Sequence, residues 1–188
     1  MSNPNIKASA PPRAAISAEI ADWSRERPRV FWDPGPKLIR TLRDFKRLGA
    51  AHDPLTRLRR AFIVLRHHFW SVVTASNVPI GWDPGGGLIL QHPTGIVIHP
   101  KTVIGANCLV MQQVTIGVAH RRRKGAPVIG GHVDIGAGAK ILGAVTIGDH
   151  AVIGANAVVL IDVPAGMAAV GVPARIIARR SEDIEIEG

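Results

Sequence analysis

Residues 128–160 read VIGGHVDIGAGAKILGAVTIGDHAVIGANAVVL, and an aliphatic side chain returns at every sixth position of this stretch. The same spacing starts earlier in the chain, and it joins Ile98, Ile104, Val110, Ile116, Ile129, Ile135, Ile141, Ile147, Ile153 and Val159. A repeat of fixed period outweighs the two-residue alternation of any single strand. The spacing predicts a coil whose flat faces each use one hexapeptide, with the aliphatic side chains inside and three faces to a turn.

The six-residue spacing is interrupted once, because Ile116 and Ile129 are thirteen residues apart. The interval contains basic side chains that cannot lie in an aliphatic core. These are His120, Arg121, Arg122, Arg123 and Lys124. We therefore predict that residues 118–127 form a loop extruded from the coil.

The part of the chain before the repeats has helical spacing. Ile16, Ile20 and Trp23 predict a helix from about Arg13 to Pro28, and a second helix is expected after Pro36. A third helix is expected to begin with Asp53 as N-cap and Pro54 in its first turn. Its apolar stripe comprises Leu55, Leu58, Phe62, Leu65, Phe69 and Val72.

These patterns predict an α+β protein, in which an α-helical region precedes a β-helix. We expect residues 1–12 to be a flexible N-terminus and residues 13–77 to form the helical domain. Residues 78–177 are expected to form the β-helix domain, and residues 178–188 a C-terminal tail.

Positive charge is concentrated in the first part of the chain. Up to Ile80 there are fourteen Lys and Arg against six acids, whereas the remainder has nine against eight. A basic region can indicate nucleic-acid contact, but no base-stacking aromatic pattern accompanies it. The favoured interpretation is solvated helix faces and contacts between subunits, and we expect no nucleic-acid partner.

Several composition features restrict the compartment and the chemistry. Cys108 is the single cysteine, which rules out an intrachain disulfide and disfavours a Cys-based zinc site. No apolar run is long enough to span a membrane, and the N-terminus lacks a signal-peptide pattern, so we expect a cytoplasmic protein without membrane contact. His99, His132 and His150 have no metal-ligand spacing with acids, and we expect no metal.

Four sequence runs carry a family resemblance. They are QHPTGIVIHPKTVIG (91–105), VTIG (114–117), VDIGAGAKILGAVTIGDHAVIGANAVVL (133–160) and VGVPARI (170–176). Together they resemble the serine O-acetyltransferases and their close relatives over about Leu88 to Ile177, and RHHFW (66–70) is similar to the family's last helix. The resemblance implies a left-handed parallel β-helix, a homotrimer and acetyl-CoA bound between neighbouring coils. It leaves open whether two trimers pair.

The resemblance also implies roles for single residues. His92 stands at the place of the family's catalytic histidine, which accepts the proton of an acceptor hydroxyl as that hydroxyl attacks the thioester. Ala137 and Ala155 match positions along which the pantetheine arm of acetyl-CoA runs. Gly117 corresponds to a position near the thioester, and Lys140 is expected to cover the outer face of the cofactor site.

The sequence departs from the family around the acceptor. Pro79 takes the place of the aspartate that orients the catalytic histidine, and Asp83 is a candidate substitute. Gln91 replaces the acid before that histidine, and Ala126 replaces a second histidine in the loop. The loop side chains can compensate by binding a substrate carboxylate or phosphate, and the candidates are His120, Arg121, Arg122 and Arg123.

Three functions remain open from the sequence. The first is acetyl transfer from acetyl-CoA to L-serine, a reaction that belongs to cysteine biosynthesis. The second is acetylation of a sugar or nucleotide-sugar hydroxyl in surface-polysaccharide synthesis, which Gln91 and the missing acid favour. The third is a non-catalytic trimeric scaffold. Family members that dock into cysteine synthase end in isoleucine, whereas this chain ends with Glu185 to Gly188, so we expect no such complex.

Overall fold

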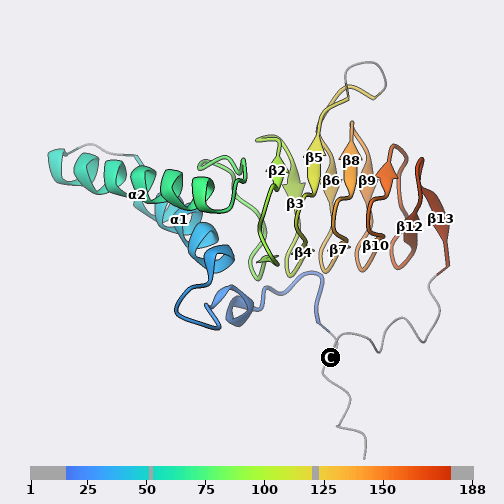
Figure 1. Ribbon diagram of the computed structural model, residues 1–188, viewed down its shortest axis with the longest axis horizontal. Helices are drawn as coiled ribbons and strands as arrows, with labels where there is room; N and C mark the ends of the chain where they lie inside the picture. The colour runs from blue at the N-terminus through green and yellow to red at the C-terminus, as the bar shows by residue number, and fades with distance from the viewer. Residues whose placement is uncertain (1–15, 51–52, 120–122, 179–188) are drawn as a thin grey trace, which may run out of the picture.

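The computed structural model describes residues 16–50, 53–119 and 123–178. A short 3-10 turn, η1 (Trp23–Glu26), precedes two helices, α1 (Pro34–Leu48) and α2 (Pro54–Val73), and the helices stand at one end of a stack of short strands (Figure 1). The strands are β1 (Ile89–Leu90), β2 (Val97–Ile98), β3 (Val103–Ile104), β4 (Leu109–Val110), β5 (Thr115–Gly117), β6 (Val128–Ile129), β7 (Asp134–Ile135), β8 (Lys140–Leu142), β9 (Thr146–Ile147), β10 (Val152–Ile153), β11 (Val158–Val159), β12 (Ala168–Val170) and β13 (Arg175–Ile177).

The strands form the three flat faces of a triangular coil. Their orders are β1-β4-β7-β10-β12-β13, β11-β8-β5-β2 and β3-β6-β9, so successive strands from β1 to β12 lie in different sheets. The pairs between β1 and β12 are parallel, and only β12 with β13 is antiparallel. The predicted six-residue repeat is therefore a parallel β-helix, with one hexapeptide to a face.

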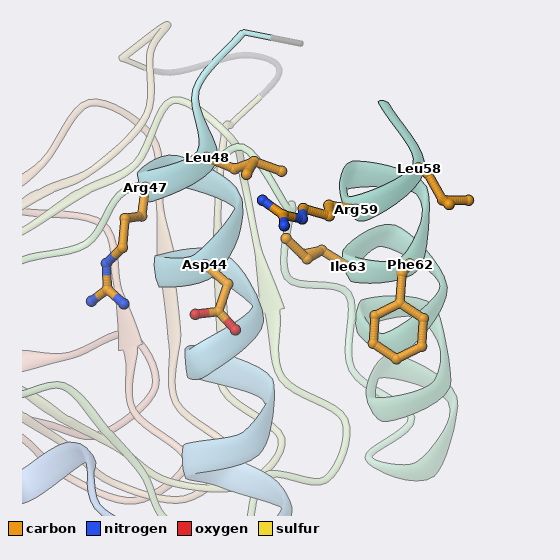
Figure 2. Close-up of a pocket in the computed structure, with 7 residues that line it drawn as sticks. All are labelled: Asp44, Arg47, Leu48, Leu58, Arg59, Phe62 and Ile63. Atoms are coloured by element: carbon orange, nitrogen blue, oxygen red, sulfur yellow. The ribbon is translucent and has the colours of Figure 1, made fainter. Parts of the chain in front are cut away.

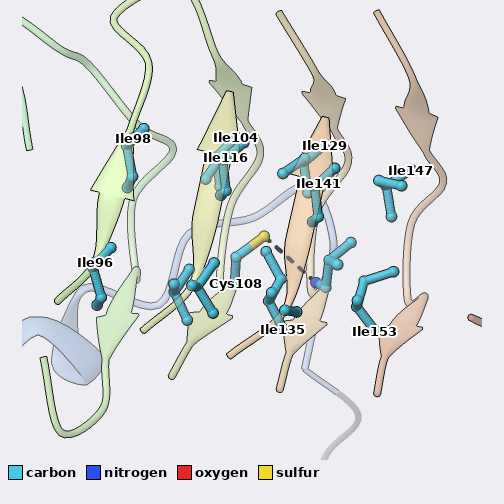
Figure 3. Close-up of a cluster of buried hydrophobic side chains, with 14 of the residues drawn as sticks. Ile96, Ile98, Ile104, Cys108, Ile116, Ile129, Ile135, Ile141, Ile147 and Ile153 are labelled. Atoms are coloured by element: carbon cyan, nitrogen blue, oxygen red, sulfur yellow. Dashed lines mark hydrogen bonds between the residues drawn. The ribbon is translucent and has the colours of Figure 1, made fainter. Parts of the chain in front are cut away.

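The core is a narrow aliphatic column inside the coil. All ten side chains of the repeat are at most 3% exposed, and Figure 3 shows the isoleucines directed into the interior. A second column, which the sequence reading did not identify, lies two residues before the first and contains Cys108, Val114, Val133, Ala139 and Val145. Residues i and i+2 of a strand share a face, which is why both columns point inward.

The loop at residues 118–127 leaves the coil between β5 and β6. Ile116 pairs with Ile141, a step of 25 residues, whereas Ile141 pairs with Val159, a step of 18. The spacing of thirteen from Ile116 to Ile129 is thus one hexapeptide and seven inserted residues, rather than two hexapeptides with one extra residue. The aliphatic register resumes at Ile129, and the described residues on either side of the insertion extend beyond the coil (Figure 1).

The prediction of a helix from Arg13 to Pro28 is wrong for its described part, because within residues 16–28 only η1 is helical. The side chain of the buried Asn107 forms hydrogen bonds with the backbone of this segment instead. Its Nδ2 donates to the carbonyls of Ser17 and Ile20, each at 2.7 Å, and its Oδ1 accepts the amide of Asp22 at 2.8 Å. Residues 16–22 therefore lie along the coil, because a single coil side chain binds the backbone groups that a helix would need.

The other two predicted helices are present. Asp53 caps α2 by accepting a hydrogen bond from the Thr56 amide at 2.9 Å. On α1, the side chains of Leu38 and Ile39 are fully buried. The apolar stripe predicted for α2 is not packed on α1, because its six residues are 50–68% exposed while Ile63 and Trp70 are buried. Only Leu58 and Phe62 of the stripe border a hollow that α1 also lines. The stripe is therefore an apolar surface of the described chain.

His67 joins both helices to the start of the coil. Its Nδ1 lies 2.7 Å from the hydroxyl of Thr41 on α1, and its Nε2 lies 2.9 Å from the carbonyl oxygen of Val78. The single proton of the Thr41 hydroxyl can be donated to Nδ1 or to the Leu38 carbonyl at 2.6 Å, so the donor in the Thr41–His67 contact depends on the tautomer of the imidazole. Burial lowers the pKa of His67 below its ordinary 6.5, and the neighbouring His68 acts in the same direction.

We expect acid to weaken the attachment of the helices through His67. A histidine whose pKa is lower in the folded state binds its proton more readily when unfolded, so stability falls as the pH drops through 6.5 towards the folded pKa. The free energy of unfolding, measured with urea between pH 8 and pH 5, should therefore decline. His67→Gln should remove part of this decline, and an unchanged pH slope in that variant would contradict the assignment.

Candidate active site

The turns between strands stack into three corners of the coil. Corner one follows β1, β4, β7 and β10, corner two follows β2, β5, β8 and β11, and corner three follows β3, β6 and β9. Stacked turns place residues from distant parts of the chain about 4.8 Å apart along the coil axis. Candidate residues therefore lie close together in one chain only when they are on the same corner.

His92 lies on corner one, in the turn after β1. Its backbone adopts φ +49°, its carbonyl accepts the Thr94 amide at 2.5 Å, and its side chain is exposed. The buried Ser76 supports the turn by donating its hydroxyl to the Pro93 carbonyl at 2.9 Å. Within the described residues the imidazole of His92 makes no hydrogen bond, so both ring nitrogens are available to a ligand. Gln91, also exposed, precedes it.

Ala137 and Ala155 lie on the same corner as His92. Backbone hydrogen bonds connect the stacked turns: Gln113 N to Thr94 O at 2.7 Å, Gly138 N to Gln112 O at 2.9 Å and Asn156 N to Ala137 O at 2.8 Å. The two alanines are two and three turns of coil beyond His92, roughly 10 and 14 Å along the axis. The turn between them and His92 carries the larger Met111, Gln112 and Gln113, so small side chains line this corner only from Ala137 onward.

Lys140 lies on the sheet that adjoins corner one. It belongs to β8, and its Nζ donates to the carbonyl of Gln113, one turn nearer His92, at 2.7 Å. The lysine therefore bridges two turns of the coil beside the column of small residues.

Gly117 and Arg123 lie on corner two. Gly117 ends β5, which starts from corner one, so about four residues of extended chain, roughly 13 Å, separate the two corners. The base of the loop is held here, because Gly143 N donates to Gly117 O and Ala144 N donates to Arg123 O, each at 2.9 Å. His120, Arg121 and Arg122 lie outside the described residues.

The guanidinium of Arg123 is engaged by Asp162. Its two NH groups donate to the two carboxylate oxygens at 2.5 and 2.8 Å, and Asp162 also accepts the Thr146 amide at 2.8 Å. These hydrogen bonds lower the pKa of Asp162. Arg123 thus anchors the loop to the coil, a role that the sequence did not indicate because the two residues are 39 apart and neither position carries a motif.

Asp83 is separated from His92 within this chain. Its carboxylate forms ion pairs with Lys46 and, at 3.6 Å, with Arg43, both on α1. The preceding Trp82 donates its indole NH to Thr102 O at 2.8 Å, which ties this segment to corner two. The hypothesis that Asp83 replaces the missing partner of His92 therefore finds no support in the geometry.

The described residues contain neither a metal-binding cluster nor a helix that could span a membrane. No group of three or more His, Cys, Asp or Glu side chains is arranged to hold a metal ion among residues 16–50, 53–119 and 123–178. None of the helices in these ranges combines the length and the apolar character that crossing a bilayer requires. A hollow of about 660 Å³ lies on the helices between α1 and α2, and its charged side chains are Asp44, Arg47 and Arg59 (Figure 2).

Known proteins share this architecture. The family described as bacterial transferase hexapeptide (six repeats) matches residues 126–160. A probable serine acetyltransferase 5 of Oryza sativa subsp. japonica is 50% identical over 106 residues, which are 54% of this chain and 30% of the rice protein. A serine acetyltransferase of Brucella abortus strain S19 in complex with coenzyme A superposes with a TM-score of 0.66 at 32% identity, over 80% of this chain and 58% of that one.

The soybean serine acetyltransferase apoenzyme decides the family. It is 32% identical with a TM-score of 0.56, and the match covers 76% of this chain and 69% of the soybean chain. This chain belongs to the serine acetyltransferase family. Membership confirms the predicted fold class, helices followed by a left-handed parallel β-helix. The chain spans less than half of the length of several curated relatives in the family, among them 48% of the Synechococcus elongatus serine acetyltransferase.

Proposed function

We propose that the protein is an acetyl-CoA-dependent O-acetyltransferase with His92 as general base and L-serine as the leading acceptor. The observation that carries the proposal is that His92 lies on the same corner of the coil as Ala137 and Ala155, which are two and three turns beyond it. Coenzyme A in the similar Brucella abortus protein supports acetyl-CoA as the co-substrate. No metal is part of the proposal.

The chemistry needs a base because a hydroxyl with a pKa far above 7 is a poor nucleophile. His92 accepts the hydroxyl proton while the oxygen forms its bond to the thioester carbonyl carbon. The carbon–sulfur bond then breaks, and the proton passes from His92 to the departing thiolate, which leaves as free coenzyme A thiol. A positioned base contributes about 10²- to 10⁴-fold to the rate of such a transfer.

The two corners support an oligomeric site. Gly117 and the loop are on corner two, whereas His92 and the alanines are on corner one of the same chain. Gly117 and the loop come next to His92 and the alanines when corner two of one copy lies beside corner one of another. We therefore propose a homotrimer in which each active site is shared between two neighbouring copies. Sedimentation equilibrium tests the trimer, and it also decides whether two trimers pair.

A sugar hydroxyl is the second candidate acceptor. An amino-acid acceptor carries an ammonium group that favours a fixed carboxylate, but Gln91 is neutral and Asp83 is paired with Lys46. Within the described residues, corner one near His92 therefore has no free acid. The loop residues 120–122 provide the positive charge that a carboxylate or a nucleotide sugar requires.

Release of free thiol from acetyl-CoA separates these proposals. With acetyl-CoA fixed, we expect L-serine to accelerate thiol release well above the rate without an acceptor, whereas L-alanine, which lacks the hydroxyl, should not. Release with sugars or nucleotide sugars alone would move the protein to the second candidate. No release with any acceptor, together with no binding of acetyl-CoA, would leave the non-catalytic scaffold.

A further inference from the structure

The basic N-terminal region has no role in the proposed acetyl transfer, yet its charges gather in one groove. A groove of about 540 Å³ runs between the η1 segment and α1. Its lining includes Arg27, Arg40, Arg43, Lys46 and Arg47, with Trp23 beside them. This volume is in the range of small-molecule sites in proteins.

The two acids of the groove are already paired. Glu26 accepts hydrogen bonds from Arg43 at 2.7 and 3.2 Å and from the amide of Gly87 at 2.9 Å. Arg43, only 14% exposed, also donates to backbone carbonyls beneath it, so this pair is structural. Asp44 accepts a hydrogen bond from Arg66 on α2. Glu26 is thus committed to Arg43, and Asp44 is shared between Arg66 and a longer ion pair with Arg40 at 3.9 Å.

Two arginines of the groove have no ion pair among the described residues, and a third has only a long one. No acid among the described residues forms an ion pair with Arg27 or Arg47, and the nearest to Arg40 is Asp44 at 3.9 Å. Arg40 and Arg47 are two helical turns apart and share one face of α1. Figure 2 shows the Arg47 guanidinium on the side of α1 that faces away from α2. Like charges held together in a concave site favour an anionic ligand.

Trp23 adds a flat surface to the groove. Its ring is 58% exposed, but its far edge lies so close to Gly86 that a Cβ there would come within 2.7 Å of the ring. The Arg43 guanidinium lies 5.2 Å from the ring centroid. The ring is therefore held in place while one side stays open to solvent, an arrangement suited to stacking with a planar group.

We propose that this groove binds a nucleotide with two or more phosphates, whose phosphates contact Arg27, Arg40 and Arg47 and whose base stacks on Trp23. Guanidinium groups bind phosphate oxygens through pairs of charge-assisted hydrogen bonds, and three of them suit a polyphosphate better than a single charge. The site lies on the helices, apart from the column that contains Ala137 and Ala155. It does not depend on the proposed acetyl transfer.

Calorimetric titration of the full chain with ADP tests the proposal. We expect saturable binding that weakens with salt and falls at least about 10-fold in Arg40→Glu/Arg47→Glu. The matched control, Arg57→Glu/Arg59→Glu on α2, reverses two other exposed arginines and should bind ADP like the parent protein. Trp23→Ala should weaken ADP but leave pyrophosphate unchanged.

Acetyl-CoA itself contains an adenine nucleotide, so the two sites must be separated. Ala155→Trp alters the coil and should retain ADP binding. The proposal is overturned if the full chain shows no saturable ADP binding, or if Ala155→Trp abolishes it while Arg40→Glu/Arg47→Glu does not. Equal affinity of the two reversal variants would also overturn it.

Discussion

Replacing His92 with alanine is expected to lower the turnover number by about 10²- to 10⁴-fold, which is the contribution of a positioned general base. Acetyl-CoA should still bind within about twofold of the parent affinity, because the small residues that line corner one are untouched. Thiol release under saturating acetyl-CoA measures the first quantity, and calorimetry measures the second. Loss of turnover without loss of binding is the signature of a group that acts in the chemical step.

The control for His92 must preserve its backbone. The residue has φ +49°, a conformation that asparagine adopts more readily than alanine. His92→Asn should therefore keep the turn but lack a base of suitable pKa, and its turnover should fall as far as that of His92→Ala. If the asparagine variant retained parent activity, the lost activity of the alanine variant would reflect the turn, and His92 would not be the base.

Replacing Ala155 with tryptophan is expected to raise the dissociation constant of acetyl-CoA by about 100-fold or more, a loss of at least about 2.7 kcal/mol. Ala155 is exposed on corner one, three turns of coil from His92, so a large side chain obstructs the proposed path of the pantetheine arm. The substitution places no bulk in the core, and the melting temperature should change little.

Ala165→Trp is the matched control for Ala155→Trp. Ala165 is equally exposed, but it follows Pro164 beside the Gly148 turn on corner three. We expect its affinity for acetyl-CoA to equal that of the parent. Parent affinity in Ala155→Trp would mean that acetyl-CoA does not run along corner one, whatever the outcome for His92.

Local sequence predicted α1 and α2 better than it predicted the segment before them. Asp53 and Pro54 are local signals that begin α2 without any help from the rest of the chain. The spacing of Ile16, Ile20 and Trp23 also favours a helix, but the side chain of Asn107, 85 residues beyond Asp22, binds the backbone there. A hydrogen bond to a distant residue leaves no trace in local spacing.

The sequence by itself determined the β-helix and singled out His92 as the candidate base, which stays a prediction. The six-residue repeat determines the coil because every inward position requires an aliphatic side chain. His92 is recognised by its motif, since it directly precedes Pro93 and Thr94. What only the tertiary structure decided is which residues share a corner. The inserted loop lengthens one step between paired strands from 18 to 25 residues, so the register after the loop cannot be counted from the repeat alone. Closure of the coil then brings Ala137 and Ala155 to the corner of His92 and Asp162 to Arg123, whereas Asp83 is paired with Lys46 on α1.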